Sequence, residues 1–306
     1  MASTRTPFEK LTPIHPNRRI TLETGATPIA TRLIDLLIPL GFGQRALIVA
    51  PPKAGKTTIL RQIASAVLTN HPQTRLFLCL VDERPEEVTE WRTEVQGPQV
   101  RLYASSFDQA LSKHGPLVER ALQDARREVE QGQDVVILLD SLTRLARVHN
   151  LSSDMWAGPR NQRGGYGSRT LSGGIDANAL EVGRRVFGAA RMLEEGGSLT
   201  IVASCLVETG SRLDDVVYEE FKGTGNLEIR LSRELADRRI FPAVDVTVSS
   251  TRQEERLLSP TELRAMSIVR RRMADLPRRD GAEQVVRLFE KTHSNAQLVE
   301  AIVRQG

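Results

Sequence analysis

Apolar runs with the character of β-strands recur along the chain, separated by stretches with the spacing of amphipathic helices. Strand-like runs cover 46–49, 76–81, 100–104, 135–139 and 199–205, and helical stretches cover 29–40, 58–64, 108–131 and 177–194. Strands that alternate with helices predict an α/β fold with a mainly parallel, doubly wound sheet. Because several runs are apolar throughout, we expect helices on both faces of that sheet.

The two ends of the chain show different patterns. Residues 1–28 are rich in Thr, Pro and Arg and have little periodicity, which predicts an N-terminal arm before a central domain over 29–252. Residues 226–232 and 244–250 alternate in the manner of antiparallel strands. Residues 253–306 predict a C-terminal helical subdomain, with about three short helices after residue 260.

A phosphate-binding sequence follows the first apolar run. Residues 50–57, Ala-Pro-Pro-Lys-Ala-Gly-Lys-Thr, stand between a strand-like run and a helical segment. This order is typical of a P-loop, where backbone N–H groups and the helix dipole favour phosphate. Lys56 is predicted to reach the β- and γ-phosphates, and Thr57 to place its hydroxyl on Mg²⁺. Ala50 replaces the usual first glycine, so the two prolines and Gly55 must set the turn.

Asp140 is a candidate metal residue, because it ends the apolar run 135–139. Ligands of open α/β sheets bind at the carboxyl ends of the strands, and an aspartate there can hold Mg²⁺ through water. The alternative is an N-cap that opens the helix after Ser141. The pairing of Asp140 with Lys56 and Thr57 favours the metal role.

Asp82, Glu83 and Arg84 follow the second apolar run. A carboxylate at that point can orient an attacking water as a general base, and Arg84 can contact the same phosphate. The alternative is an ordinary helix start, with Pro85 near its first position and acidic residues favoured by the helix dipole. The residues alone leave both interpretations open.

Two loops carry glycine and arginine. Residues 158–169 form a basic loop with one aromatic residue, a composition suited to single-stranded nucleic acid. A mobile solvated loop is the alternative, and composition alone slightly favours it. A second loop, 208–215, follows the strand-like run 199–205. We expect both loops to leave the sheet on one side.

Composition is ordinary for a globular protein, with 40% apolar residues, 26% charged residues and a net charge of +4. The charge is a weak indication of a polyanionic partner. Cys79 and Cys205 lie in apolar runs and are predicted to be buried free thiols. The sequence shows neither a signal peptide nor a membrane-length apolar stretch, which predicts a cytoplasmic protein with no membrane partner.

Several motifs together resemble the ATPase domain of the bacterial transcription termination factor Rho family. They occupy residues 50–57, 82–90, 137–147, 194–201 and 218–226, in the family's order. The resemblance runs from about Phe8 to the C-terminus. It implies that 29–252 is a RecA-like P-loop NTPase domain. It further implies an RNA-dependent ATPase of helicase type, a hexameric ring that hydrolyses ATP with Mg²⁺ at subunit interfaces and pulls single-stranded RNA through its centre.

The resemblance also implies roles for individual residues. The nucleotide would be lined by Gly41, Phe42, Gly43, Gln44, Arg45, Ala46, Lys53, Ala54, Gly55, Lys56, Thr57 and Thr58, with Phe241 stacked on adenine. Asp140 would hold the Mg²⁺ water, Glu83 would be the catalytic base and Arg84 would contact phosphate. Arg252 would be the arginine finger that reaches the neighbouring subunit's ATP.

RNA would be gripped by two loops at the centre of the ring. Their residues would be Arg169, Thr170, Leu171, Ser172, Gly173, Gly174, Ile175, Asp176 and Arg212. Arg169 and Arg212 stand where the family carries lysine. Because the two side chains differ in geometry and hydration, we expect a changed grip on RNA.

The sequence departs from the family in two further ways. The loop between Asn150 and Leu171 is longer than usual, and nothing before Phe8 could form the family's RNA-loading domain. RNA loading and termination are therefore expected to differ, whereas the ATPase chemistry is retained. Expected partners are single-stranded RNA, identical subunits, RNA polymerase and full-length Rho. The alternatives are a non-terminating regulator that joins mixed rings and a protein-driving RecA-like ring ATPase, which the residues disfavour.

Overall fold

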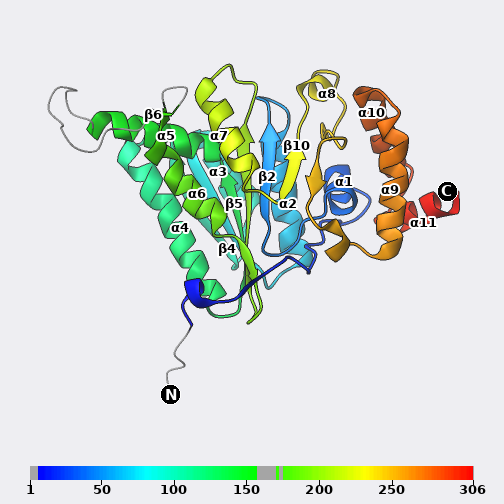
Figure 1. The fold of residues 1–306 in the computed structure, drawn as a ribbon, viewed down its shortest axis with the longest axis horizontal. Coiled ribbons are helices and arrows are strands. Elements are labelled where there is room, and N and C mark those ends of the chain that lie inside the picture. The colour runs from blue at the N-terminus through cyan, green and yellow to red at the C-terminus, as the bar shows by residue number, and fades with distance from the viewer. Residues whose placement is uncertain (1–5, 157–169, 172–174, 306) are drawn as a thin grey trace.

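The computed structural model describes residues 6–156, 170–171 and 175–305, with side chains for 6–151 and 179–304. A β-sheet with the strand order β11-β10-β2-β9-β5-β3-β4 forms its centre (Figure 1). Six neighbouring strands of this order are parallel: β10 (Leu227–Arg230), β2 (Arg45–Ala50), β9 (Ser198–Leu206), β5 (Asp134–Asp140), β3 (Arg75–Glu83) and β4 (Val100–Ser106). The predicted α/β class with a mainly parallel sheet is confirmed.

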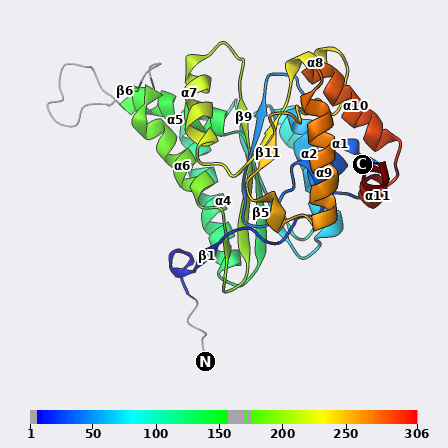
Figure 2. The same cartoon turned by 45° about the vertical axis from the view of Figure 1, so that its right-hand side comes forward.

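Helices cover both faces of the sheet. The core on one face holds α1 (Ile29–Leu37), α2 (Lys56–Asn70) and α3 (Pro85–Glu94), and it extends outward through α9 (Pro260–Ala274), α10 (Arg278–Glu290) and α11 (Asn295–Gln305), which pack against α1 and one another. The other is packed by α4 (His114–Val129), α5 (Leu142–Trp156), α6 (Glu181–Gly188) and α7 (Arg212–Lys222). Figures 1 and 2 show these two groups on opposite sides of the strands. Continuous apolar strands follow from this double cover, since neither face meets water.

Side chains of each strand alternate between the two cores. In β3, Leu76, Leu78 and Leu80 belong to the core under α1 and α2, whereas Phe77, Cys79 and Val81 belong to the core under α4 and α5. In β5 the even-numbered residues, Val136 and Leu138, share the first core. This period-two rule fixes which residues at the strand ends can share a face.

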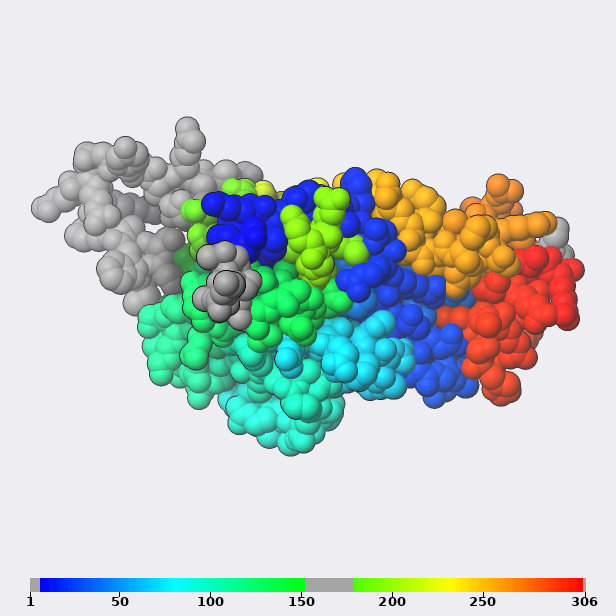
Figure 3. Space-filling model, turned by 90° about the horizontal axis from the view of Figure 1, so that it is seen from below, coloured from blue at the N-terminus to red at the C-terminus, as the bar shows by residue number. Residues whose placement is uncertain are grey.

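The N-terminal arm is part of the folded structure rather than a loose lead-in. Phe8, Ile20 and Leu22 are buried. Within the arm, β1 (Pro13–Ile14) pairs antiparallel with β8 (Arg191–Leu193), which also pairs with β9. Figure 3, a view from below, shows the arm in blue lying across this side of the molecule.

A buried arginine attaches the C-terminal helices to α1. Arg32 is fully buried, and its guanidinium donates to the carbonyls of Ala26, Phe289 and Thr292 at 3.2, 2.9 and 2.7 Å. It also donates to Thr292 Oγ1 at 2.8 Å and to Asn295 Oδ1 at 3.3 Å. The helices predicted after residue 260 are confirmed as α9, α10 and α11.

Two predicted elements differ from the structure. The predicted helix over 177–194 is a 3₁₀ turn (Ala177–Leu180) followed by α6, which ends at Gly188, and the chain then pairs as β8. Tertiary pairing with β1 and β9 thus overrides the helical pattern. The predicted antiparallel pairing of 226–232 with 244–250 is confirmed in part, because β10 pairs antiparallel with Ser250–Thr251 and Leu231 forms an antiparallel bridge to Val244, whereas the other side of β10 is parallel to β2.

Residues 245–249 form a turn in place of the middle of the predicted strand. Asp245 accepts the backbone N–H of Thr247 at 3.0 Å, and the Asp245 carbonyl accepts that of Ser249 at 3.1 Å. This local turn takes the hydrogen bonds that a strand would need. The strand β11 (Ser250–Thr251) begins only where the turn ends, and α8 (Arg233–Asp237) lies between β10 and the turn.

Both cysteines are buried free thiols, as predicted. Burial raises the pKa of each thiol to about 12. Among the described residues, no helix has both the length and the apolarity needed to cross a bilayer.

Arg32→Met should lower the free energy of unfolding by about 3 kcal/mol or more, because it removes the arginine donor from the buried acceptors of Thr292 and Asn295. Denaturant unfolding followed by circular dichroism measures the change. Arg304→Met is the control, since that side chain is 76% exposed on α11, and it should change stability by less than about 0.5 kcal/mol. Equal effects of the two substitutions would contradict the anchoring role of Arg32.

Candidate nucleotide-binding site

The P-loop connects the carboxyl end of β2 to the first residue of α2. Gly55 precedes α2 with φ of +92°, and among the described residues no atom lies within 4 Å of the position that a Cβ would take. Glycine is therefore required here by backbone angle rather than by crowding. Ala50 is the buried last residue of β2, with ordinary strand pairing to β9, so the usual glycine is not needed at that position.

A buried cluster of charges lies behind the loop. Lys56 Nζ donates to Asp140 Oδ1 and lies 3.9 Å from Glu83 Oε1. The two carboxylate side chains are only 2% and 1% exposed, respectively. Ser204 Oγ, from β9, also donates to Asp140 Oδ1 at 2.8 Å. The structure thus brings together residues that the sequence places in separate segments.

The cluster fits a divalent cation. Asp140 Oδ2 and Glu83 Oε1 are buried without a hydrogen-bond partner among the described residues. Such oxygens are costly unless a cation or water satisfies them. The described residues contain no group of three or more His, Cys, Asp or Glu that could hold a metal alone. Two such buried oxygens suit Mg²⁺, which takes one or two protein ligands and completes its shell with water and phosphate.

Glu83 is held in an environment that disfavours its charge. Burial, and then the nearby Asp140, raise the pKa of Glu83 to about 7, against the opposing effects of Lys56 and Arg144. A carboxyl group with a pKa near neutrality is suited to accept a proton at physiological pH.

Arg144 is a site residue that the sequence analysis missed. Its guanidinium donates to the backbone carbonyl of Asp82 and lies 3.3 Å from Glu83 Oε2. Arg144 stands four residues after Asp140, on the first turn of α5. This spacing from the strand end could have indicated that Arg144 lies near the site. Arg84, by contrast, is exposed, its Nε lies 3.9 Å from Glu87 Oε1, and its phosphate contact stays a prediction.

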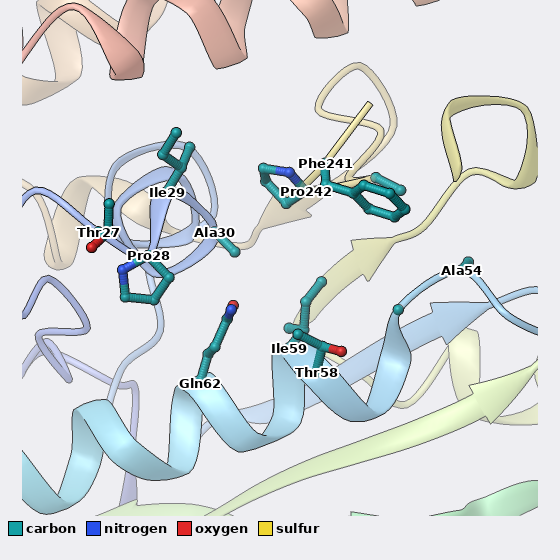
Figure 4. Close-up of a pocket in the computed structure, with 12 residues that line it drawn as sticks. Thr27, Pro28, Ile29, Ala30, Ala54, Thr58, Ile59, Gln62, Phe241 and Pro242 are labelled. Carbon is teal, nitrogen blue, oxygen red and sulfur yellow. The ribbon is translucent and has the colours of Figure 1, made fainter. Parts of the chain in front are cut away.

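A hollow of about 450 Å³ opens beside the P-loop. Figure 4 shows Phe241 and Pro242 facing the first turns of α2, with residues 27–30 along another side. Phe241 is 49% exposed, which leaves a ring surface free beside Ala54. The shape and apolar lining suit a flat aromatic group such as a nucleobase.

The predicted lining by Gly41–Ala46 is not found within this chain. This segment precedes and begins β2, so it lies at the opposite end of that strand from the P-loop. Except for Arg45, its residues are buried, and Gln44 Oε1 accepts the backbone N–H of Gly41 at 2.7 Å. The segment therefore shapes the turn into β2.

Arg252 lies at that same far end. Its backbone N–H donates to Asn226 O at 2.9 Å, and Asn226 in turn bonds the backbone of Arg45. Burial, with the like charges of Arg191 and Arg252, lowers the pKa of Arg45. A strand of this length spans roughly 17–20 Å, so Arg252 is remote from Lys56 of its own chain.

A family model described as "ATP synthase alpha/beta family, nucleotide-binding domain" matches residues 30–251. Proteins named transcription termination factor Rho match almost the whole chain. That of Streptomyces coelicolor is 52% identical over 289 residues, which are 94% of this chain and 66% of the relative. That of Bacillus subtilis is 48% identical over 301 residues, which are 98% of this chain and 67% of the relative.

The chain belongs to this nucleotide-binding family and is a Rho homologue. The resemblance read from the sequence motifs is thereby confirmed. The Rho protein of Rhodopirellula baltica is 46% identical over 296 residues, which are 97% of this chain and 56% of the relative. The chain thus spans 56% to 67% of the length of these three Rho proteins.

Solved structures show the same fold at greater distance. An ATPase from the type III secretion system of pathogenic bacteria superposes with a TM-score of 0.76 at 21% identity, over 96% of this chain and 86% of that one. The assembled type III secretion ATPase EscN of enteropathogenic E. coli gives 0.74 at 21% identity, over 95% and 72% of the two chains. These likenesses support the RecA-like fold class alone.

The predicted RNA-binding residues are only partly covered by the structure. Arg169 and Ser172, Gly173 and Gly174 lie outside the described residues. The backbone of Thr170–Leu171 (β6) pairs antiparallel with that of Ile175–Asp176 (β7). Arg212 is exposed at the first position of α7, and its neighbour Asp214 accepts Arg147 of α5. The second predicted loop, 208–215, therefore lies beside α5, through the ion pair of Asp214 with Arg147.

Glu83→Gln should stabilise the protein above neutral pH when nucleotide and metal are absent. With a pKa of about 7 in the folded state, Glu83 binds its proton more tightly than in the unfolded state, so wild-type stability falls as pH rises toward and through 7. The variant escapes this loss, worth about 1–3 kcal/mol. Thermal unfolding midpoints from about pH 5 to 8.5 measure the difference.

Glu86→Gln removes the same charge at an exposed position beside the site. Its difference from wild type should stay small and nearly constant with pH. A Glu83→Gln difference that is equally flat would contradict the raised pKa.

Proposed function

We propose that this chain is the motor domain of an RNA-dependent ATPase of helicase type. It hydrolyses ATP at subunit interfaces of a homohexameric ring, moves along single-stranded RNA in the cytoplasm and contributes to transcription termination with RNA polymerase. One observation carries the proposal: the buried group of Lys56, Asp140 and Glu83 directly behind a P-loop, in a Rho homologue. The Rho name of the relatives supports the link to termination.

The P-loop and Lys56 hold the phosphates of ATP. Backbone N–H groups at the start of α2 face that position, and the helix dipole favours the negative charge. With Lys56 on the phosphates, the Asp140 carboxylate, which pairs with Lys56 in this structure, would hold Mg²⁺ together with Thr57. The bound Mg²⁺ would supply neutralisation of the phosphate charge. Phe241 stacks on the base in the adjoining hollow.

Glu83 accepts the proton of the attacking water. Its raised pKa and its burial beside Lys56 give a base that is poised near neutrality and shielded from bulk water. Arg144 holds the carboxylate from α5 and keeps it at the edge of the phosphate position. The contact with Arg144 therefore helps to set the orientation of the Glu83 carboxylate in the site.

Arg252 serves a neighbouring site. Because it lies at the far end of β2 from its own P-loop, and its side chain is exposed, a role on ATP requires a second subunit. There its guanidinium stabilises the charge of the transition state, an effect on the order of 10³-fold or more in rate. The position of Arg252 far from its own P-loop supports the proposed ring, in which neighbouring subunits share each site.

ATP turnover should rise at least about tenfold when single-stranded RNA is added, since RNA held by the predicted RNA-binding residues would complete the site. A coupled phosphate-release assay with poly(C) and with mixed-sequence RNA measures it. Glu83→Gln supplies the inactive reference, with nucleotide binding retained. Turnover that no RNA concentration changes would exclude the RNA motor and favour a protein-driving ring ATPase.

Mixing Arg252→Ala with Lys56→Ala subunits should restore part of the turnover that each variant lacks alone. In a mixed ring, some interfaces pair an intact Lys56 with an intact Arg252 from the neighbour. The assay is ATP hydrolysis against mixing ratio, alongside oligomer mass. Mixing Lys56→Ala with Glu83→Gln is the matched control, because both changes fall in one chain's half of the site and restore nothing. Recovery equal to this control would place Arg252 outside the reaction.

A further inference from the structure

The strand β3 breaks its register immediately before Glu83. Leu80 pairs with Ala104 of β4, but the next pair is Glu83 with Ser106, so β3 holds one extra residue at this point. Asp82 stands in the left-handed region, with φ of +55°. An extra residue with such a backbone angle is a β-bulge, which redirects the side chain after it.

The bulge decides which face Glu83 can reach. Odd-numbered residues of β3, such as Cys79 and Val81, face the core under α4 and α5. Regular alternation would send residue 83 to the same side. Asp140, by contrast, continues the even-numbered face of β5, toward α2 and Lys56. The bulge therefore allows Glu83 to lie 3.9 Å from Lys56 and beside Asp140.

Two buried side chains from β4 and α4 support the bulge. Ser105 Oγ accepts the backbone N–H of Asp82 at 3.2 Å, and His114 Nδ1 lies 2.7 Å from the same Oγ. Ser105 is 2% exposed and His114 is fully buried. A hydroxyl can accept from the amide and still donate to, or accept from, the imidazole, so both contacts can form together.

The bulge needs such support because its backbone is strained. A left-handed angle at a residue other than glycine costs about 1–3 kcal/mol and persists only where surrounding contacts enforce it. Phe107 N donates to Glu83 O at 3.0 Å and fixes the strand beyond the bulge. The Asp82 amide is fixed from the other side by Ser105, which His114 holds in place at the start of α4.

We infer that Ser105 and His114 are positioning residues that hold the bulge at Asp82 and so aim Glu83 at the reacting water. The inference rests on the proposed role of Glu83 as the base. Neither side chain needs to touch nucleotide, since each acts through the backbone of Asp82. Loss of either contact lets β3 relax toward regular pairing, which turns Glu83 toward α4 and α5.

Ser105→Ala tests this assignment through a split between kcat and KM. We expect kcat for ATP to fall about tenfold or more, with KM and the nucleotide Kd within about twofold, because only the base is misplaced. Ser198→Ala is the matched control. Ser198 is also buried, and its hydroxyl donates to Asp134 Oδ1 at 2.7 Å. This contact lies at the amino ends of β9 and β5, away from the site. Ser198→Ala should lower the free energy of unfolding as much as Ser105→Ala does, but it should leave kcat unchanged.

His114 gives a second, independent measurement. His114→Asn keeps a polar group near the position of Nδ1 and should retain most of kcat, whereas His114→Leu should lose as much as Ser105→Ala. If Ser105→Ala fails to fold, the comparison of kcat and KM between His114→Asn and His114→Leu tests the inference instead. Equal kcat values for His114→Asn and His114→Leu would overturn the inference, as would a Ser105→Ala kcat equal to that of Ser198→Ala.

Failure of this inference is distinguishable from failure of the proposed function. If Glu83→Gln retains turnover, Glu83 is not the base and the proposed function is at fault. If Glu83→Gln is inactive while Ser105→Ala matches Ser198→Ala, the base is correct and the Ser105–His114 clamp does not position it.

Discussion

The site depends on the parallel alignment of six neighbouring strands. Both faces of this sheet are covered by helices, so polar side chains on the strands are tolerated mainly where each strand ends. The P-loop after Ala50, Glu83 at the end of β3 and Asp140 at the end of β5 share one edge for this reason. A single geometric rule thus gathers residues from distant parts of the sequence into one cluster.

The resulting cluster is electrostatically incomplete. Two buried carboxylates face Lys56, with Arg144 beside Glu83, and one oxygen of each carboxylate has no hydrogen-bond partner among the described residues. Burial, and then the nearby Asp140, raise the pKa of Glu83 despite the two cations. Such an arrangement weakens the fold locally and is best relieved by a ligand that brings its own cation. The site is therefore built to be most stable when it is filled.

Periodicity and motif spacing were enough to predict the central sheet and the pairing of Lys56 with Asp140. Continuous apolar runs indicated a doubly covered parallel sheet, and the P-loop and the end of the run 135–139 indicated Lys56 and Asp140, whereas the role of Glu83 followed only from the family resemblance. Features that depend on tertiary context were not predictable. The strand β8 lies within a helical pattern, and residues 244–250 alternate like a strand although Asp245 folds them into a turn. Arg144 becomes a site residue only because the start of α5 lies beside the end of β3. The bulge at Asp82 is invisible to a period-two pattern.

Arg32 links the hollow beside the P-loop to the C-terminal helices. The first residues of α1 and the two before it form one wall of the hollow beside the P-loop, and Arg32 follows within the same helical turn. Since the guanidinium is bonded to the end of α10 and the start of α11, buried hydrogen bonds tie this wall to the C-terminal helices. The shape of the hollow beside the P-loop therefore depends on residues more than 250 positions further along the chain.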